Sequence, residues 1–130
     1  KSVQARSKKQ FLKNDMDDTT DIIIEFKNGA TGYLSTLTAT ADTWRLQVFG
    51  TKGWAEIRDQ HNFYIKMNNQ QMRKKLIKKI DTEKAELEIF VNSFKNHNKY
   101  PVKLDEAYSN IKLLEKIILS IKKNKLIKLN

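Results

Sequence analysis

The sequence predicts an α+β domain of two layers, in which a largely antiparallel, open sheet has helices packed on one face. In the first half of the chain, apolar residues alternate with polar ones between short turns, which is typical of antiparallel strands. In the second half, apolar residues recur every three or four positions, which indicates helices. We expect strands over about residues 17–67 and helices over about 82–98 and 105–123, within a single domain spanning 1–130.

The expected strands follow one another through tight turns. Ile22, Ile24 and Phe26 alternate before an Asn28-Gly29 turn, and the threonine-rich segment TGYLSTLTATA continues from it. Alternating apolar residues return in WRLQVF, WAEI and FYIKM. Because successive strands joined by short turns pair with their neighbours, this half predicts an antiparallel meander.

The segment Gly50-Thr51-Lys52-Gly53 admits three interpretations. Glycines around a lysine can cradle phosphate, and G-x-x-G also occurs in the nucleic-acid-binding loop of KH domains. Both of those loops lead into a helix, whereas WAEIRD, after Gly53, alternates like a strand. The sequence therefore predicts a β-hairpin turn, in which Lys52 points into solvent and a glycine supplies a positive φ.

The second half begins with the polar and basic stretch NNQQMRKKLIKKI, residues 68–80. A loop, a ragged strand and a short amphipathic helix are all open for it, and we interpret it as a linker. Two amphipathic helices follow it, and the final LIKL is expected to add a short strand. The expected core stripe of the first helix is Leu87, Phe90, Val91 and Phe94; that of the second is Ala107, Ile111, Leu114, Ile118 and Ile121. With both helices on one face of the sheet, the other face stays open to a partner.

The net charge of +10 raises the question of an anionic partner. Only four of the 25 basic residues are arginine, the residue that phosphate- and base-reading surfaces favour. We interpret the charge as a solvated surface and expect no nucleic-acid partner. A free-standing basic module that binds RNA or DNA is kept as the alternative function.

No constellation of residues for catalysis, cofactor binding or metal binding is recognised in the sequence. Cysteine is absent, and His61 and His97 each lie in a polar stretch. The aspartates at 15, 17, 18 and 21 lack the glycine and final glutamate of a calcium-binding loop. The lack of cysteine and of any apolar run near ~20 residues leads us to expect a cytoplasmic protein without a membrane partner.

Three longer segments stand in a specific order. DDTTDIIIEFKNGATGYLSTL spans residues 17–37, and WRLQVFGTKGWAEIRD spans residues 44–59. The third segment begins at Glu86 and runs to Leu129, with two helical patterns and an extended tail. Taken together, they resemble the C-terminal domain of the Gfo/Idh/MocA oxidoreductases (glucose-fructose oxidoreductase, inositol dehydrogenase and relatives).

The resemblance implies a two-domain parent enzyme that oxidises or reduces a sugar or cyclitol with NAD or NADP. In such relatives an N-terminal Rossmann domain binds the nucleotide, and the second domain contributes to the substrate pocket and to subunit contacts. The family's dinucleotide fingerprint, Glu-Lys-Pro motif and catalytic helix are not found here. We therefore expect a partial C-terminal domain that lacks the Rossmann domain, binds no cofactor and is inactive alone.

The resemblance also locates the substrate side of the domain. In relatives the turn before the second segment approaches the substrate, and here this turn covers residues 41–45. The resemblance implies that Asp42 binds hydroxyl groups, Trp44 stacks on a sugar ring and Arg45 pairs with an anionic substituent. Trp44 has an alternative role, in the core or at a subunit interface. We further expect a homo-oligomer formed through the open face of the sheet.

Overall fold

The computed structural model describes residues 1–95 and 99–129, which form an α+β fold with antiparallel sheets. The chain divides into two compact units. Unit 1 combines the two ends of the chain, Lys1–Thr40 and Pro101–Asn130, and unit 2 is the contiguous segment Ala41–Tyr100. The α+β class predicted from the sequence is confirmed.

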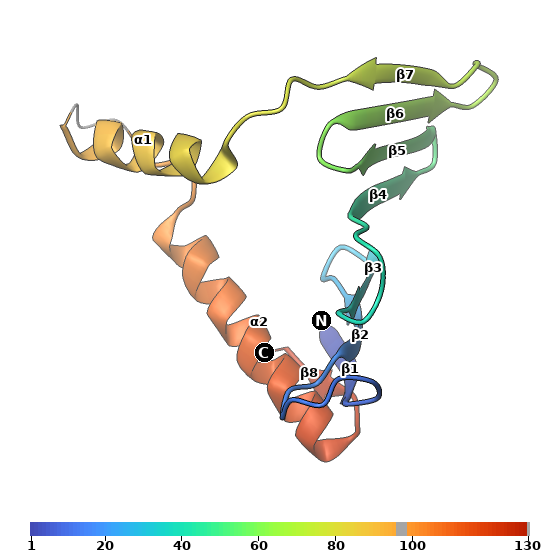
Figure 1. The fold of residues 1–130 in the computed structure, drawn as a ribbon, viewed down its shortest axis with the longest axis vertical. Coiled ribbons are helices and arrows are strands. Elements are labelled where there is room, and N and C mark those ends of the chain that lie inside the picture. Colours follow the sequence, from blue (N-terminus) through green and yellow to red (C-terminus); the bar gives the residue numbers. More distant parts are fainter. Residues whose placement is uncertain (96–98, 130) are drawn as a thin grey trace. The chain divides into compact units, whose positions relative to one another are not determined.

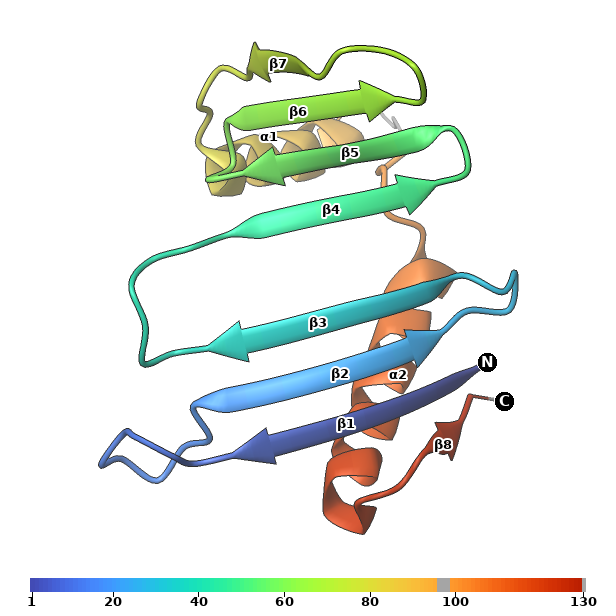
Figure 2. The same ribbon diagram turned by 90° about the vertical axis from the view of Figure 1, so that its right-hand side faces the viewer.

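Unit 1 contains a four-stranded antiparallel sheet, ordered β3-β2-β1-β8 (Figure 2). Its strands are β1 (Ser2–Lys8), β2 (Thr19–Glu25), β3 (Thr31–Leu37) and β8 (Ile127–Lys128). The Asn28-Gly29 turn joins β2 to β3, with Gly29 at a φ of 91°. The short terminal strand predicted from LIKL is confirmed as β8.

The strand β1 was not predicted, because the expected strands began near residue 17. Val3 and Ala5 are the apolar residues of SVQARSK, which otherwise reads as a polar and basic segment. Both are almost fully buried, since β1 is central in its sheet and pairs with β2 and β8. Burial of β1 thus depends on residues more than a hundred positions away in the sequence.

The helix α2 (Leu104–Lys123) packs on one face of this sheet, as Figures 1 and 2 show. The core joins Val3, Ala5 and Ile22 to residues of α2 and the C-terminal tail: Leu113, Ile117, Ile121, Ile127 and Leu129. The predicted core stripe of α2 is only partly correct, because Ile111, Leu114 and Ile118 are exposed. This helix is apolar on two sides, and the side carrying Leu113 and Ile117 covers the sheet.

Ser120 fastens the end of α2 to β1. Its side chain is fully buried; its hydroxyl accepts a hydrogen bond of 2.9 Å from the backbone N–H of Ala5. The same hydroxyl donates a hydrogen bond of 2.6 Å to the carbonyl oxygen of Lys125. A serine therefore satisfies two backbone groups where a purely apolar contact would leave them unpaired.

Asp18 organises the loop between β1 and β2. Its carboxylate is 2% exposed and accepts hydrogen bonds from the backbone N–H groups of Gln10, Phe11 and Leu12, and from the Thr19 hydroxyl. The hydrogen bonds from Leu12 and Phe11 contribute most to lowering its pKa to about 2, from an ordinary value of 3.8. The acidic cluster thus contains one structural carboxylate.

We expect this carboxylate to make unit 1 sensitive to acid. A lowered folded-state pKa gives stability that is present above the unfolded value of 3.8 and is lost as the pH falls toward 2. Thermal melts from pH 5 to pH 2 should therefore show a falling melting temperature. In Asp18→Asn the melting temperature at pH 5 should be lower and its decline with acid shallower. The control Asp17→Asn, next to it, should behave like wild type; equal slopes in all three proteins would contradict the assignment.

Unit 2 contains a second four-stranded antiparallel sheet, ordered β4-β5-β6-β7. Its strands are β4 (Arg45–Gly50), β5 (Gly53–Arg58), β6 (Asn62–Met67) and β7 (Arg73–Leu76). Every consecutive pair in this order is antiparallel, as the alternation predicted. The sheet is therefore a meander of local hairpins.

The Gly50-to-Gly53 segment is a hairpin turn, as predicted. Gly50 pairs with Gly53, so Thr51 and Lys52 form the tip, and Lys52 is exposed. Asn68, in the turn directly after β6, holds the tip: its backbone N–H donates to the Lys52 carbonyl and its side-chain amide donates to the Thr51 carbonyl. Gly53 has a φ of 149°, so the positive φ expected of a glycine is at this position.

The stretch 68–80, interpreted as a linker, includes the strand β7. All four residues of β7 are exposed, and it pairs with β6 as an edge strand. Lysine and arginine are common on edge strands, where charge discourages pairing with another chain. The linker interpretation is therefore wrong for residues 73–76, where the alternative of a strand is correct.

The helix α1 (Thr82–Lys95) begins where the sequence predicted, and its N-terminus is capped by Asp81, which accepts a hydrogen bond from the Lys84 N–H. Leu87, Phe90 and Phe94 of its apolar stripe are exposed. Tyr100 contacts Phe90 edge-to-face, with ring centroids 6.0 Å apart. The predicted end of this helix, with His97 at 96–98, lies outside the described residues.

Candidate functional site

The predicted substrate residues lie at one end of the sheet of unit 2. Asp42 is exposed in the segment before β4, and Trp44, which is 46% exposed, directly precedes that strand. The Trp44 carbonyl accepts a hydrogen bond of 3.0 Å from the backbone N–H of Asp59, at the end of β5. This bond anchors the segment to the β5–β6 turn, whose residues Asp59 and Gln60 both have positive φ.

Arg45 begins β4 and lies directly opposite Arg58 of β5. Two like charges in one cross-strand pair repel each other unless a counter-charge is near. Glu56 supplies it: its carboxylate is 2% exposed and accepts two hydrogen bonds from Arg58, of 2.7 Å from Nε and 3.1 Å from Nη2. The Arg45 Nε lies 4.0 Å from the same carboxylate.

This arrangement favours the charged forms of Glu56 and Arg58. The hydrogen bonds from Arg58 are the main cause that lowers the pKa of Glu56, and the charges of Arg58 and Arg45 add to it. In return, the hydrogen bond to Glu56 is the main cause that raises the pKa of Arg58. A buried carboxylate thus stays ionised between two guanidinium groups, as charge pairing requires.

Further charged and aromatic groups continue along the same face. The guanidinium carbon of Arg58 lies 5.2 Å from the ring centroid of Tyr64, and the Lys74 Nζ lies 5.5 Å from that centroid. Tyr64 is the cross-strand partner of both Glu56 and Lys74. Cations at this distance are attracted by an aromatic ring. The face is therefore polar and positively charged across four strands.

Of the predicted residues, Arg45 is the one that the structure joins to this charged cluster. Asp42 and Trp44 lie beside it in the chain, with Asp42 exposed and Trp44 half-exposed. Sequence reasoning missed Glu56, Arg58 and their neighbours. A signal was present, because residues two apart in WAEIRD share a face and so bring a carboxylate and a guanidinium together.

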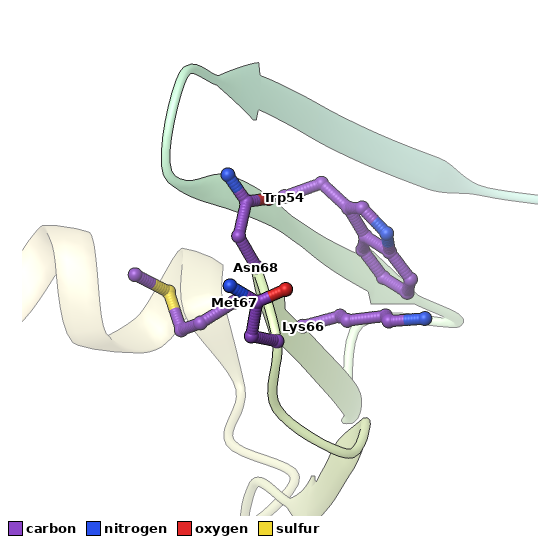
Figure 3. Close-up of a pocket in the computed structure, with 6 residues that line it drawn as sticks. Trp54, Lys66, Met67 and Asn68 are labelled. Carbon is purple, nitrogen blue, oxygen red and sulfur yellow. The ribbon is translucent and has the colours of Figure 1, made fainter.

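A hollow of about 460 Å³ opens at the other end of this sheet, next to the hairpin turn. It is lined by Gly53, Trp54, Lys66, Met67, Asn68 and Asn69 (Figure 3). In Figure 3 the side chains of Trp54 and Lys66, which are cross-strand partners, extend in the same direction, and Met67 points the opposite way. The hollow contains none of the predicted substrate residues.

Two features were looked for in the described part of the chain and are absent from it. Within residues 1–95 and 99–129, no three His, Cys, Asp or Glu side chains gather to hold a metal ion. Across the same ranges, neither helix is long and apolar enough to cross a membrane.

Comparison with known proteins assigns the first part of the chain. Residues 1–56 match the model of the GFO/IDH/MocA C-terminal domain. This part of the chain is similar to that domain. The match begins at residue 1 and so includes β1, whereas the resemblance drawn from the sequence began at residue 17. The sequence matches none of the curated proteins with which it was compared.

Solved structures show the same fold along nearly the whole chain. Levoglucosan dehydrogenase in complex with NADH and L-sorbose has a TM-score of 0.82 and 15% identity, and the match covers 99% of this chain and 44% of that one. An aldose-aldose oxidoreductase from Caulobacter crescentus, complexed with glycerol, has a TM-score of 0.78 and 16% identity, and the match covers 98% of this chain and 41% of that one. An oxidoreductase from Agrobacterium radiobacter, in complex with NAD+, L-tartaric acid and magnesium, has a TM-score of 0.80 and 15% identity, and the match covers 98% of this chain and 42% of that one.

The chain therefore spans less than half the length of the oxidoreductases whose fold it shares. The match over residues 1–56 is consistent with the family resemblance drawn from the sequence. At 15–16% identity these structures establish the fold. The predicted roles of Asp42, Trp44 and Arg45 remain predictions.

Proposed function

We propose that this chain is the substrate-side and oligomerisation domain of an NAD(P)-dependent oxidoreductase that acts on a sugar or cyclitol. The observation that carries the proposal is the family match over residues 1–56. The fold is consistent with it, since 97–99% of the chain aligns with structures that include oxidoreductases bound to NADH or NAD+. In this proposal the nucleotide is held by a Rossmann domain outside these 130 residues.

The proposed substrate side is the end of the unit 2 sheet that carries Asp42, Trp44 and Arg45. Exposed carboxylate, indole and guanidinium groups there offer a hydrogen-bond acceptor, an apolar ring face and a bidentate donor. Two of the compared enzymes are complexed with polyhydroxylated compounds, glycerol and L-sorbose. A polyhydroxylated substrate would use all three groups of this chain.

The gene region upstream of the codon for Lys1 tests the proposed function. We expect it to encode a strand, a G-x-G-x-x-G turn and a helix, followed by a Glu-Lys-Pro motif. The protein from that longer reading frame should bind NADH or NADPH, measured by nucleotide fluorescence, while the 130-residue chain alone should not. An upstream region without the fingerprint would contradict the proposal.

The proposed oligomer contact is the face of the unit 1 sheet that α2 leaves open. Ile22 and Ile24 pack toward α2, so their neighbour Ile23 and its cross-strand partner Tyr33 lie on the opposite face. Tyr33 is 79% exposed and Leu37, on the same face, is 56% exposed. Apolar and aromatic side chains at such exposure are typical of a surface that a partner covers.

We expect Tyr33→Glu to weaken self-association, because it places a charge in the proposed apolar contact. Sedimentation velocity over a range of protein concentrations should show a dimer for wild type and a monomer for the variant. Tyr108→Glu is the control, since Tyr108 is 59% exposed on α2, away from this face. A monomeric wild type, or a control that dissociates equally, would contradict this contact.

A further inference from the structure

Between Asp59 and Asp81 the chain carries six basic residues and no acidic one. They lie on β6, on β7 and in the segment that joins β7 to α1. The basic stretch after Glu115 has a similar charge, but it contains no aromatic residue. In unit 2 the positive charge lies on a sheet that also carries phenylalanine, tyrosine and tryptophan. Cations together with aromatic rings are typical of surfaces that bind nucleic acid.

One row of side chains across this sheet places two aromatic rings beside a cation. Phe49 of β4 lies opposite Trp54 of β5, and Lys66 of β6 lies opposite Trp54 on its other side. Opposite residues project from the same face of a sheet, so the three form one row. Phe49 is 73% exposed, and Trp54 and Lys66 extend in the same direction at the hollow of about 460 Å³ (Figure 3). The row is therefore accessible to a ligand.

The acidic residues of the sheet are paired away from this row. Glu56 accepts two hydrogen bonds from Arg58, and its Oε1 lies 4.0 Å from the Arg45 Nε. The hydrogen bond to Glu56 is the main cause of the raised pKa of Arg58, and the charge of Asp59 adds to it. Two acids thus balance the two arginines at that end. In the described part of the chain, none of the six basic residues between positions 60 and 80 has a carboxylate oxygen within 4.0 Å. Their charge is available to an anionic ligand.

We propose that this face of the unit 2 sheet binds single-stranded RNA or DNA, with bases stacked on Phe49 and Trp54. Every base has a flat face, so stacking on aromatic side chains tolerates any sequence. Lys66, beside Trp54, would pair with the phosphate of a stacked nucleotide. Bases in a duplex are already stacked on one another, and a lipid surface offers no flat rings, so neither suits the row. The proposal goes beyond the oxidoreductase function, and for this sheet it replaces the interpretation of the net charge as a solvated surface.

The test measures how the 130-residue chain binds fluorescein-labelled oligouridylate, oligothymidylate and duplex DNA, by fluorescence anisotropy. All three are about twelve units long, within the usual range for a single-strand site. At about 0.05 M salt we expect a single strand to bind about tenfold more tightly than the duplex, because stacking adds to the phosphate contacts. The stronger of the two single strands identifies RNA or DNA as the ligand. Vesicles that contain phosphatidylserine should bind more weakly than either.

Two pairs of variants separate stacking from charge. Phe49→Ala should weaken single-strand binding about tenfold and leave duplex binding unchanged. Its matched control is Phe94→Ala, which removes an 81% exposed ring from α1 of the same unit and should bind like wild type. Lys66→Gln should lower the slope of log K against log salt by about 0.7, the value of one phosphate contact on a single strand. Lys122→Gln, at the exposed end of α2, should leave that slope unchanged.

Trp54 gives a second readout. Trp44→Phe leaves Trp54 as the sole tryptophan, and its emission should be quenched by oligothymidylate but not by heparin, a polyanion without bases. Four results would overturn the inference: no single-strand binding, single strand and duplex bound within twofold of each other, equal losses in Phe49→Ala and Phe94→Ala, or tighter binding to the phosphatidylserine vesicles than to either single strand. Equal quenching of Trp54 by heparin would also contradict stacking.

Discussion

Gly53→Val is expected to destabilise unit 2 by about 3 kcal/mol or more. A Cβ atom on Gly53 would overlap the carbonyl oxygen of Lys66 and lie 2.8 Å from the Cα atom of Met67. Both are backbone atoms of β6, which cannot move aside without breaking the pairing of β5 with β6. The φ of 149° adds backbone strain for any other residue.

Urea unfolding followed by tryptophan fluorescence measures this effect, since both tryptophans, Trp44 and Trp54, belong to unit 2. Gly50→Ala is the matched control at the other end of the same turn. Its added Cβ would meet the Gly53 carbonyl oxygen at 3.7 Å, an ordinary contact. Lys52→Ala should likewise leave the free energy of unfolding nearly unchanged. If all three variants unfold at the same urea concentration as wild type, the hairpin geometry is wrong.

Ile22→Ala is expected to cost unit 1 about 3 kcal/mol, as the removal of a well-packed core isoleucine does. Ile22 is 7% exposed and belongs to the core formed with Val3 and Ala5 against α2. The truncation leaves a cavity between the sheet and the helix. Urea unfolding followed by far-ultraviolet circular dichroism measures this loss.

The neighbouring residue gives the control. Ile23→Ala removes the same atoms from the opposite face of β2, where the side chain is 44% exposed, and should cost less than about 1 kcal/mol. Low protein concentration keeps any self-association from contributing. Equal losses in the two variants would show that the faces of β2 are assigned wrongly.

Local patterns predicted the hairpins, because alternation and turn glycines act over a few residues. The strand β1 was missed because Val3 and Ala5 are buried by α2 and β8, which lie at the far end of the sequence. The sequence also could not show which side of α2 packs on the sheet, since the helix is apolar on two sides. In each case the contact that buries the residues joins segments far apart in the sequence. The periodicity of apolar residues within one segment does not predict such a contact.

Part of the charged cluster could have been predicted from the sequence. Once Gly50 pairs with Gly53, counting five residues outward from the turn puts Arg45 opposite Arg58. Alternation puts Glu56 on the same face as Arg58. The burial of Glu56 and the two hydrogen bonds that it accepts from Arg58 were not predictable, because they depend on how the side chains pack.

The pairing of the two chain ends in unit 1 has a consequence for folding kinetics. The Ala5 N–H donates a hydrogen bond to the Ser120 hydroxyl, and β8 pairs with β1. The sheet of unit 1 is therefore complete only when segments from opposite ends of the sequence come into contact. The strands of unit 2 pair with their immediate neighbours in the chain. Since contacts between distant residues slow folding, the sheet of unit 2 should form first. During synthesis, unit 1 should complete its sheet only after β8, which ends at Lys128, has left the ribosome.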